Sequence, residues 1–443
     1  MHTIPTAPSL REAIRSSSAA ARRFLNVFFD EGTFLETGTY RKNGEGCFEG
    51  VVTGFGAVDG RPVFAFVQDY ENGRGALTAV HAAKIAALYD SAMKAGAPIV
   101  GVFAGAGAKL TEGIDCLSAY GLLLTKAQKA KERIPQIAVI AGDCGGASAV
   151  FAEAFDFTVS DRKSGERYLL PSVDKKADTK ADLFAEGVED LAAKTRLLLN
   201  HLPSNSKEGT VCGLFDETVN QPTDVADVND PEALLARLAD DGRVLLLGEE
   251  KAPEMVCGLL MLGGRVIGAV GNQPKENGGR LTCGAAKKAS RFLDFCNRFA
   301  VPVLTLVNTE GLGDKACGGY AEALLTLSSC YGKVGSAKVT VIVGKAYGAA
   351  FTYLGAKSVG ADLVFALDRA VISVLPPETA VEFLWDERLK AAADPKEARE
   401  ALKAEWIATQ ASPLMAARSG DVDDIVASDE LKQRIAAAFE MLA

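Results

Sequence analysis

The sequence predicts an α/β protein built from two tandem copies of one domain, and an internal repeat is the first reason. Residues 60–107 align with residues 264–311 at a constant offset of 204, with 11 of 48 positions identical. After a slip of two residues, 137–149 align with 339–351 at an offset of 202. A repeat of about 200 residues is far longer than any solenoid period, so it indicates the duplication of a whole domain.

The order of elements within each copy is the second reason. Residues 85–93 place apolar side chains at the spacing of an amphipathic helix, and residues 289–296 repeat the pattern. Pro98 and Pro302 then introduce continuous apolar runs, which are typical of strands covered on both faces by helices. Strands that alternate with helices favour an α/β sheet joined by right-handed crossovers.

The two copies are expected to form two domains. At 443 residues the chain has room for two cores of ordinary size. Periodicity fades between residues 203 and 232, which are rich in Pro, Asn, Asp and Gly, so we predict domains at residues 1–222 and 223–443. The polar segment 161–182 is predicted to be an exposed loop with no part in the core.

Composition argues against several classes of protein. A net charge of -9 and a pI near 5.2 make nucleic acid an unexpected partner. The nine cysteines contain no CxxC pair, which argues against a zinc ribbon or a disulfide framework and favours a reducing compartment. The longest apolar stretch, 256–270, is too short to span a membrane and is interrupted by Arg265. We therefore expect a soluble, cytoplasmic protein without a metal site.

Glycine-rich turns are the clearest candidate site. Residues 142–147 and their counterparts 344–350 each follow an apolar strand and precede a helix, where backbone amides can hold negative charge on an oxygen atom. Residues 104–109 and 308–313 follow the preceding strands and offer further amides. Amides that converge from two loops make an oxyanion hole, and the duplication predicts two. The alternative is that each glycine simply permits a tight turn.

Side chains suited to catalysis are scarce. The three histidines are His2, His81 and His201, with no repeated Ser-His-Asp or Cys-His arrangement. Glu112 could act as an acid or a base, but its position favours a carboxylate at the start of a helix. This scarcity favours a reaction that depends on backbone dipoles.

Short motifs from about Leu25 to the C-terminus together match one family. In the first copy they are residues 50–54, 60–61, 68–69, 81–85, 112–113 and 134–137, and in the second copy 272–274, 289–292, 338–342, 345–348, 380–382 and 423–426. In these motifs the chain resembles the biotin-dependent carboxyltransferases. This family includes β subunits of acyl-CoA carboxylases and α subunits of methylmalonyl-CoA and glutaconyl-CoA decarboxylases.

The resemblance implies two crotonase-like domains that divide one reaction. In this family the N-terminal domain binds an acyl-CoA and stabilises its enolate, while the C-terminal domain binds biotin on a separate carrier protein, and no metal is required. By position, the residues for the enolate are Ala106, Gly107, Gly145 and Gly146. Those for the biotin oxygen are Gly311, Leu312, Gly348 and Ala349, and Tyr347 is also placed beside the biotin.

The resemblance also implies partners. They are a biotin carboxyl carrier protein, a biotin carboxylase or a membrane decarboxylase subunit, and further copies of the chain, because each active site forms between domains of two subunits of a dimer or hexamer. The chain departs from the family pattern between Gly165 and Arg196, where a segment is missing. Two other readings stay open: a crotonase-type acyl-CoA enzyme that needs no biotin, and a shortened, non-catalytic relative with a role in assembly.

Overall fold

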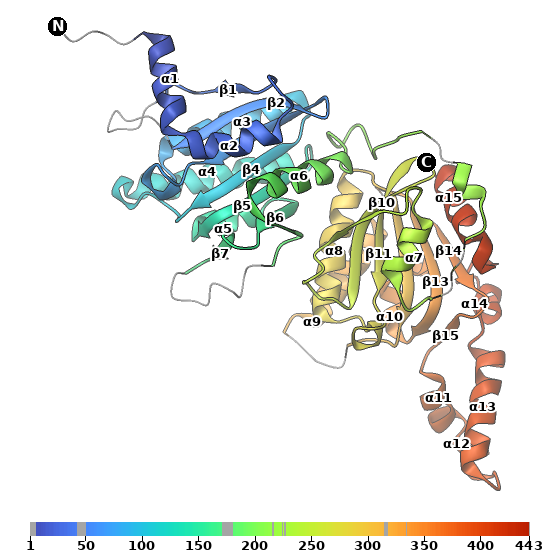
Figure 1. Cartoon of the computed structure of the whole chain (residues 1–443). Helices are drawn as coiled ribbons and strands as arrows, with labels where there is room; N and C mark the ends of the chain where they lie inside the picture. The colour runs from blue at the N-terminus through green and yellow to red at the C-terminus, as the bar shows by residue number, and fades with distance from the viewer. Residues whose placement is uncertain are drawn as a thin grey trace. The chain divides into compact units, whose positions relative to one another are not determined.

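The computed structural model divides the chain into two compact units, Met1–Gly209 and Thr210–Ala443 (Figure 1). It describes residues 6–41, 50–170, 180–214, 217–223, 225, 227–313, 318–333 and 335–442. The division falls inside the predicted seam but before residue 222. The reason is backbone pairing: the Val266 amide donates to the Val211 carbonyl at 2.9 Å, and the Gly213 amide donates to the Gly264 carbonyl at 2.6 Å.

The first unit is a mixed sheet with helices on it. Its strands follow the order β1-β2-β3-β4-β5-β6-β8, and β7 pairs with β5 beyond that row. The strands are β1 (Leu35–Thr37), β2 (Val51–Val58), β3 (Arg61–Gln68), β4 (Ile99–Gly105), β5 (Gln136–Gly145), β6 (Phe157–Asp161), β7 (Glu166–Tyr168) and β8 (Leu183–Ala185). The helices are α1 (Ala7–Ser17), α2 (Ala19–Phe28), α3 (Ala79–Ala95), α4 (Ile114–Lys131), α5 (Ala147–Glu153) and α6 (Gly187–Asn200).

The second unit has the same topology. Its strands follow the order β16-β14-β13-β12-β11-β10-β9, and β15 pairs with β13. The strands are β9 (Val244–Leu247), β10 (Met255–Leu262), β11 (Arg265–Asn272), β12 (Val303–Thr309), β13 (Lys338–Tyr347), β14 (Leu363–Leu367), β15 (Val371–Ser373) and β16 (Asp424–Val426). The helices are α7 (Pro231–Leu238), α8 (Cys283–Arg298), α9 (Tyr320–Gly332), α10 (Ala349–Tyr353), α11 (Pro377–Leu384), α12 (Asp386–Lys390), α13 (Pro395–Gln410), α14 (Pro413–Ser419) and α15 (Leu431–Met441).

The two units confirm the duplication and the α/β prediction. In each, an antiparallel hairpin (β2 with β3, β10 with β11) leads into three parallel strands. The strands β2, β3 and β4 match β10, β11 and β12 at the offset of 204, while β5 matches β13 at 202. The sequence repeat is therefore a repeat of strand order as well as of residues.

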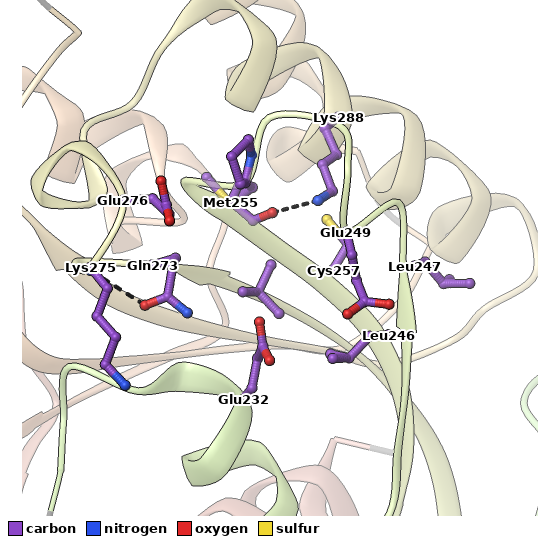
Figure 2. A pocket seen from close by; sticks show the side chains of 12 residues that line it. Glu232, Leu246, Leu247, Glu249, Met255, Cys257, Gln273, Lys275, Glu276 and Lys288 are labelled. Atoms are coloured by element: carbon purple, nitrogen blue, oxygen red, sulfur yellow. Dashed lines mark hydrogen bonds between the residues drawn. The ribbon is translucent and has the colours of Figure 1, made fainter. Parts of the chain in front are cut away.

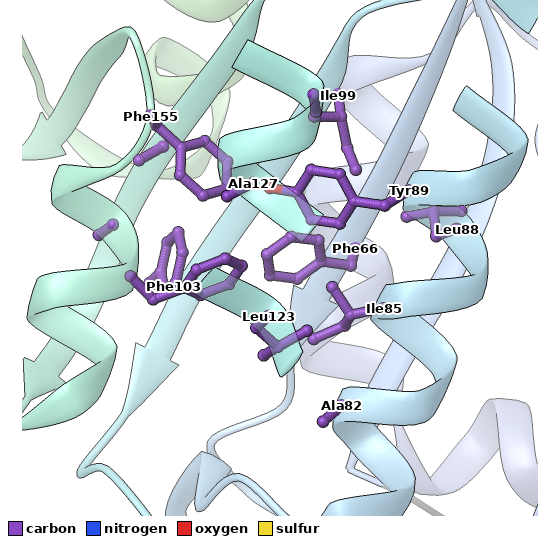
Figure 3. Packing of buried hydrophobic residues seen from close by; sticks show 14 of the residues in the cluster. Phe66, Ala82, Ile85, Leu88, Tyr89, Ile99, Phe103, Leu123, Ala127 and Phe155 are labelled. Carbon is purple, nitrogen blue, oxygen red and sulfur yellow. The ribbon is translucent and has the colours of Figure 1, made fainter. Parts of the chain in front are cut away.

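Aromatic rings fill the core of the first unit (Figure 3). Phe66 and Phe103 meet edge to face at a centroid distance of 5.6 Å, and Phe103 meets Phe155 in the same way at 5.6 Å. The fully buried Tyr89 hydroxyl donates to Oε1 of Gln136 at 2.9 Å, which satisfies both polar groups inside an apolar core. This core joins α3, α4 and α5 to the strands β3, β4 and β5.

The second unit adds four helices, α11 to α14, between β15 and β16, and α11–α13 extend away from its sheet (Figure 1). They have a small core of their own, in which Trp385 and Trp406 meet at a centroid distance of 5.0 Å. The Trp406 indole donates to Oγ of Ser373 at 3.1 Å, so this addition is tied to β15.

The prediction that residues 161–182 form a loop with no part in the core is wrong for its described part. Asp161 is buried at the end of β6 and accepts the Gly187 amide at 3.1 Å. Residues 166–168 form β7, which pairs in parallel with the end of β5. Residues 171–179 lie outside the described part. Across the part of the chain that the structure describes, no helix combines the length and apolar character needed to cross a membrane.

Candidate functional site

Each predicted glycine turn is shorter than the sequence suggests. Strand β5 continues to Gly145 and α5 begins at Ala147, so the turn is Gly146 alone, with a φ of 59°. In the second unit β13 ends at Tyr347 and α10 begins at Ala349, which leaves Gly348 with a φ of 64°. Side chains are strained at positive φ, so glycine is required at both turns.

The amides of the two turn glycines are already bonded. Gly146 donates to the Tyr168 carbonyl at 2.8 Å, and Gly348 donates to the Ser373 carbonyl at 2.9 Å. The next amide belongs to the first residue of a helix, Ala147 in α5 and Ala349 in α10, and such amides have no acceptor within the helix. The donor that each turn presents to a ligand is therefore this first helical amide.

A second loop lies against each turn. A Cβ atom built on Gly107 would lie 3.3 Å from the Gly145 carbonyl oxygen, and one built on Gly311 would lie 3.6 Å from the Tyr347 carbonyl oxygen. Both glycines have positive φ, 114° and 124°. The structure thus brings together the two loops of each predicted oxyanion hole.

The repeated Leu-Thr pair holds these second loops in place. The Leu77 amide donates to the Gly107 carbonyl at 2.8 Å, and the Leu281 amide donates to the Gly311 carbonyl at 3.0 Å. These bonds fix the peptide groups that join Gly107 to Ala108 and Gly311 to Leu312, so those groups cannot rotate freely. The Ala106 amide donates to the Arg74 carbonyl at 3.3 Å. The Ala106 amide is therefore not a donor for a ligand, although Ala106 lies next to Gly107.

In the second unit the same loop has additional polar contacts. The Gly311 amide donates to Oγ1 of Thr309 at 3.2 Å. The Leu312 carbonyl accepts from Nη1 of Arg280 at 3.4 Å, so Leu312 lies at the predicted loop with its carbonyl bonded to a cation. Burial, followed by the negative charges of Glu378 and Glu310, raises the pKa of Tyr347 to about 12, so its hydroxyl remains protonated at neutral pH.

His81 and Glu112, which were considered as catalysts, have structural partners. The Gly50 amide donates to Nε2 of the buried His81 at 3.2 Å. The Glu112 carboxylate accepts the Ala79 amide at 2.7 Å, so it is a carboxylate at the start of a helix, which is α3. Burial raises the pKa of the Cys144 thiol to about 12, which removes its nucleophilic thiolate form.

A cavity of about 630 Å³ adjoins the turn of the second unit, a volume in the usual range of small-molecule sites. Gly348, Ala349 and Thr352 line one side of it, and Trp406 and Asp421 line another. The helices α13 and α14 supply several of its walls. The added helices of the second unit therefore enclose space next to the Gly348 turn.

A smaller cavity, of about 280 Å³, lies beside β9 and β10 of the second unit (Figure 2). Burial raises the pKa of Glu232 there, with further contributions from the negative charges of Glu249 and Asp230. Nζ of Lys288 donates to the Met255 carbonyl at 2.6 Å.

The first unit has a matching cavity of about 230 Å³, lined in part by its own repeated lysine, Lys84. Nζ of Lys84 donates to the Val51 carbonyl, as Nζ of Lys288 donates to that of Met255. Val51 and Met255 are the first residues of β2 and β10. The repeated lysine therefore fastens a helix to the hairpin in both units.

The sequence did not reveal the two carbonyl groups, of Tyr168 and Ser373, that receive the turn amides. One signal was present: Leu170-Pro171 recurs as Leu375-Pro376 at an offset of 205. Extending the repeat through these residues would have placed β7 and β15 beside the turns. Neither was found because three-residue strands carry almost no periodic pattern of their own.

Comparison with known proteins identifies the family. A family model described as the carboxyl transferase domain matches residues 16–169 and 178–443. The chain belongs to this family. The family model leaves residues 1–15 and 170–177 unmatched, and the second gap falls in the segment where the sequence departs from the family pattern.

Individual relatives extend over nearly the whole chain. A putative propionyl-CoA carboxylase beta chain of Bacillus subtilis is 33% identical over 94% of this chain and 87% of its own length. The methylmalonyl-CoA decarboxylase subunit alpha of Veillonella parvula is 30% identical over 96% and 90%.

A solved structure of transcarboxylase 12S, a hexamer with methylmalonyl-coenzyme A and methylmalonic acid bound, matches with a TM-score of 0.92. It is 26% identical and covers 100% of this chain and 96% of its own. The family and the crotonase-like fold expected from the motifs are both confirmed.

Proposed function

We propose that this carboxyl transferase moves a carboxyl group between biotin on a separate carrier protein and a short-chain acyl-CoA, with one unit for each partner. The observation that carries the proposal is that each unit has an oxyanion frame, by which we mean a glycine loop beside a strand-to-helix turn. In each unit a loop glycine, Gly107 or Gly311, lies beside the carbonyl of the last strand residue, and the first amide of the next helix, Ala147 or Ala349, follows two residues later. Two oxygens that develop negative charge in one reaction need two such frames.

The first unit serves the acyl-CoA. Removing or adding the carboxyl group passes through an enolate, whose oxygen the amides of Gly107 and Ala147 stabilise. Glycine at position 145 allows the Tyr168 ring to pack against the end of β5, because a Cβ atom there would lie 2.8 Å from that ring. Fixed amide dipoles need no reorganisation when the charge appears, which is why such donors accelerate enolate formation.

The second unit serves biotin, and its residues fit that group. The cavity of about 630 Å³ beside Gly348 and Ala349 has room for a small bicyclic ring, and the Ala349 amide at the start of α10 is a donor for its carbonyl oxygen. Biotin, when bound, supplies the ureido nitrogen that carries the carboxyl group. The indole of Trp406 and the Ser373 hydroxyl, which bond to each other at 3.1 Å, keep this wall in position.

The substrate and the partners follow from the relatives. Propionyl-CoA carboxylase and methylmalonyl-CoA decarboxylase subunits are about equally similar to the chain, so we propose a propionyl-CoA and methylmalonyl-CoA type of substrate. The proposed partners are a biotin carboxyl carrier protein, a biotin carboxylase or a membrane decarboxylase subunit, and further copies of the chain in a dimer or hexamer. Cysteines without paired spacing favour a place in the reducing cytoplasm.

Transfer of labelled carboxyl groups from methylmalonyl-CoA to free biotin tests this proposal. The intact protein should catalyse the transfer. Gly146→Val and Gly348→Val place a side chain at positive φ and should displace the Ala147 or Ala349 amide, so each should lower kcat by about 10²–10³, the usual cost of losing an oxyanion donor. Gly121→Ala is the matched control, since Gly121 lies on the exposed face of α4 with no atom within 4 Å of an added Cβ.

Two outcomes would contradict the proposal. Turnover of acyl-CoA at the same rate with and without biotin would select a crotonase-type enzyme that needs no biotin. Absence of both turnover and acyl-CoA binding, together with stable co-purification with a longer relative, would select a role in assembly.

A further inference from the structure

Three charged side chains form a cluster on the Gly311 loop of the second unit. Nζ of Lys345 lies 2.7 Å from Oε1 of Glu310, and Nη2 of Arg280 lies 3.6 Å from Oε2 of the same carboxylate. Each oxygen of Glu310 therefore faces its own cation. Among these three side chains two positive charges meet one negative charge, while the nearby carboxylate of Glu378, whose pKa the charge of Lys345 helps to lower, pairs with Lys403.

Backbone contacts fix all three residues to the loop and strand of the second oxyanion frame. The Glu310 amide donates to the Gly278 carbonyl at 3.1 Å, and the next residue is Gly311. Nη1 of Arg280 donates to the Leu312 carbonyl at 3.4 Å. The Lys345 amide donates to Oδ1 of Asn308 at 2.9 Å, two residues before Tyr347. The cluster is thus held at the edge of the frame that faces the biotin oxygen.

The cluster is open to a ligand. The side chains of Arg280, Glu310 and Lys345 are 34%, 36% and 49% exposed. Ion pairs with this much exposure contribute little to stability, because water screens their charges. The fold therefore gains little from these ion pairs, and a dissolved anion can reach both cations.

The first unit has the same backbone frame without the cluster. At the offsets of the repeat, Arg280 corresponds to Ala76, Glu310 to Ala106 and Lys345 to Asp143. The amide of Ala106 even makes the equivalent bond, to the Arg74 carbonyl. Because the frame is shared and the cations are not, the charges serve something that only the second unit binds.

We propose that Lys345 and Arg280 bind the carboxylate group that is being transferred, and that Glu310 holds the two cations in place until this group arrives. The inference rests on the proposed function and names the residues that receive its anionic group. A lysine and an arginine together suit a carboxylate, since hydrogen bonds between ionised groups are stronger than neutral ones. The proposal concerns binding alone, with no covalent bond formed by these side chains.

Malonate, a free carboxylate, is the probe for this site, and its affinity is measured by isothermal titration calorimetry on the full-length protein. Lys345→Met and Arg280→Met should each raise the Kd for malonate about tenfold. Glu310→Gln should lower it about threefold, because the competing carboxylate is gone. The Kd for free biotin, which has no transferable carboxylate, should change less than about twofold in all three. Arg399→Met, which breaks the exposed pair between Arg399 of α13 and Glu382 of α11, is the control and should leave both affinities unchanged.

The opposite sign expected for Glu310→Gln separates ligand binding from a structural role. A loss of malonate affinity in all three variants, or no binding by the unmodified protein, would overturn the inference. The proposed function fails separately, if the unmodified protein binds malonate as described yet transfers no carboxyl group to biotin.

Discussion

The Gly146 amide donates to the carbonyl oxygen of Tyr168 at 2.8 Å. This bond ties the turn at the end of β5 to β7, and the second unit repeats it between Gly348 and Ser373. A carbonyl that holds the turn amide fixes the direction of the next peptide, which carries the first helical amide of α5. The short strands β7 and β15 therefore orient the two candidate oxyanion holes.

Crowding at this turn gives a prediction for Gly145. Gly145→Ala should lower kcat at least about tenfold and the free energy of unfolding by about 1–3 kcal/mol. The added Cβ would lie 2.8 Å from the Tyr168 ring, which must move and take β7 with it. Gly121→Ala on the exposed face of α4 should instead raise stability by about 0.5–1 kcal/mol. Steady-state kinetics and denaturant unfolding check both, and equal activity in the two variants would contradict the assigned geometry.

The arginine of the repeated Gly-Arg pair should contribute more to the free energy of unfolding in the first unit than in the second. Nη1 and Nη2 of Arg61 donate to the carbonyls of Leu199 and Leu202 at 3.0 and 2.8 Å, and burial lowers the pKa of Arg61. Arg61→Met should cost about 2–3 kcal/mol, because two part-buried carbonyls lose a charged donor. Arg265→Met should cost less than about 1 kcal/mol, since Arg265 makes longer bonds at an exposed helix end.

Denaturant unfolding of the two variants provides the measurement. A larger effect of Arg265→Met than of Arg61→Met would refute this account. The comparison is internally matched, since both arginines begin the second strand of a hairpin in their unit.

Asp230 predicts a pH dependence of stability. A hydrogen bond from Lys275, followed by the Ala233 amide at the start of α7, lowers the pKa of Asp230 below its ordinary value of 3.8. The stabilisation is therefore present above pH 3.8 and is lost as the pH falls through the lower folded-state pKa. Asp230→Asn keeps the helix cap but removes the charge, so it should cost up to about 1 kcal/mol at neutral pH.

Unfolding free energies at neutral pH and at about pH 3 check this, and the gap between the variant and the parent should narrow on acidification. Asp227→Asn is the control, because Asp227 lies 4.0 Å from Lys275 and is 55% exposed. A gap for Asp230→Asn that widens at low pH would show that the ion pair is not the source of the stability.

Thiol reactivity should differ sharply between two cysteines. Cys212 is exposed, whereas Cys144 is buried with its pKa raised to about 12. Brief treatment of the native protein with iodoacetamide near pH 8 should alkylate Cys212 and leave Cys144 unmodified, because the thiolate is the reactive form. Peptide mass spectrometry gives the readout. Early modification of Cys144 would mean that the end of β5 opens readily and that the turn is not rigid.

Much of the fold was predictable from the sequence because it depends on local pattern and on a repeat. The amphipathic spacing of residues 85–93 and the apolar runs after Pro98 and Pro302 lie within the helices and strands observed. The glycines of the turns were predictable too, since positive φ at Gly146 and Gly348 admits little else. Which amides of these turns stay free of a protein acceptor was not predictable, because the hydrogen bond from Gly146 to Tyr168 depends on which strand pairs with the end of β5.

The sequence by itself determined the duplication, the α/β class, the family and the glycines on which two oxyanion frames depend. The tertiary structure alone decided which amides remain for a ligand. It also decided that Arg280, Glu310 and Lys345 meet beside the frame of the second unit, where the first unit has no such cluster at the corresponding positions. The reason is physical. Spacing along the chain encodes local conformation, while the meeting of residues 30 to 65 positions apart is set by strand register and by the loops that the sheet brings together.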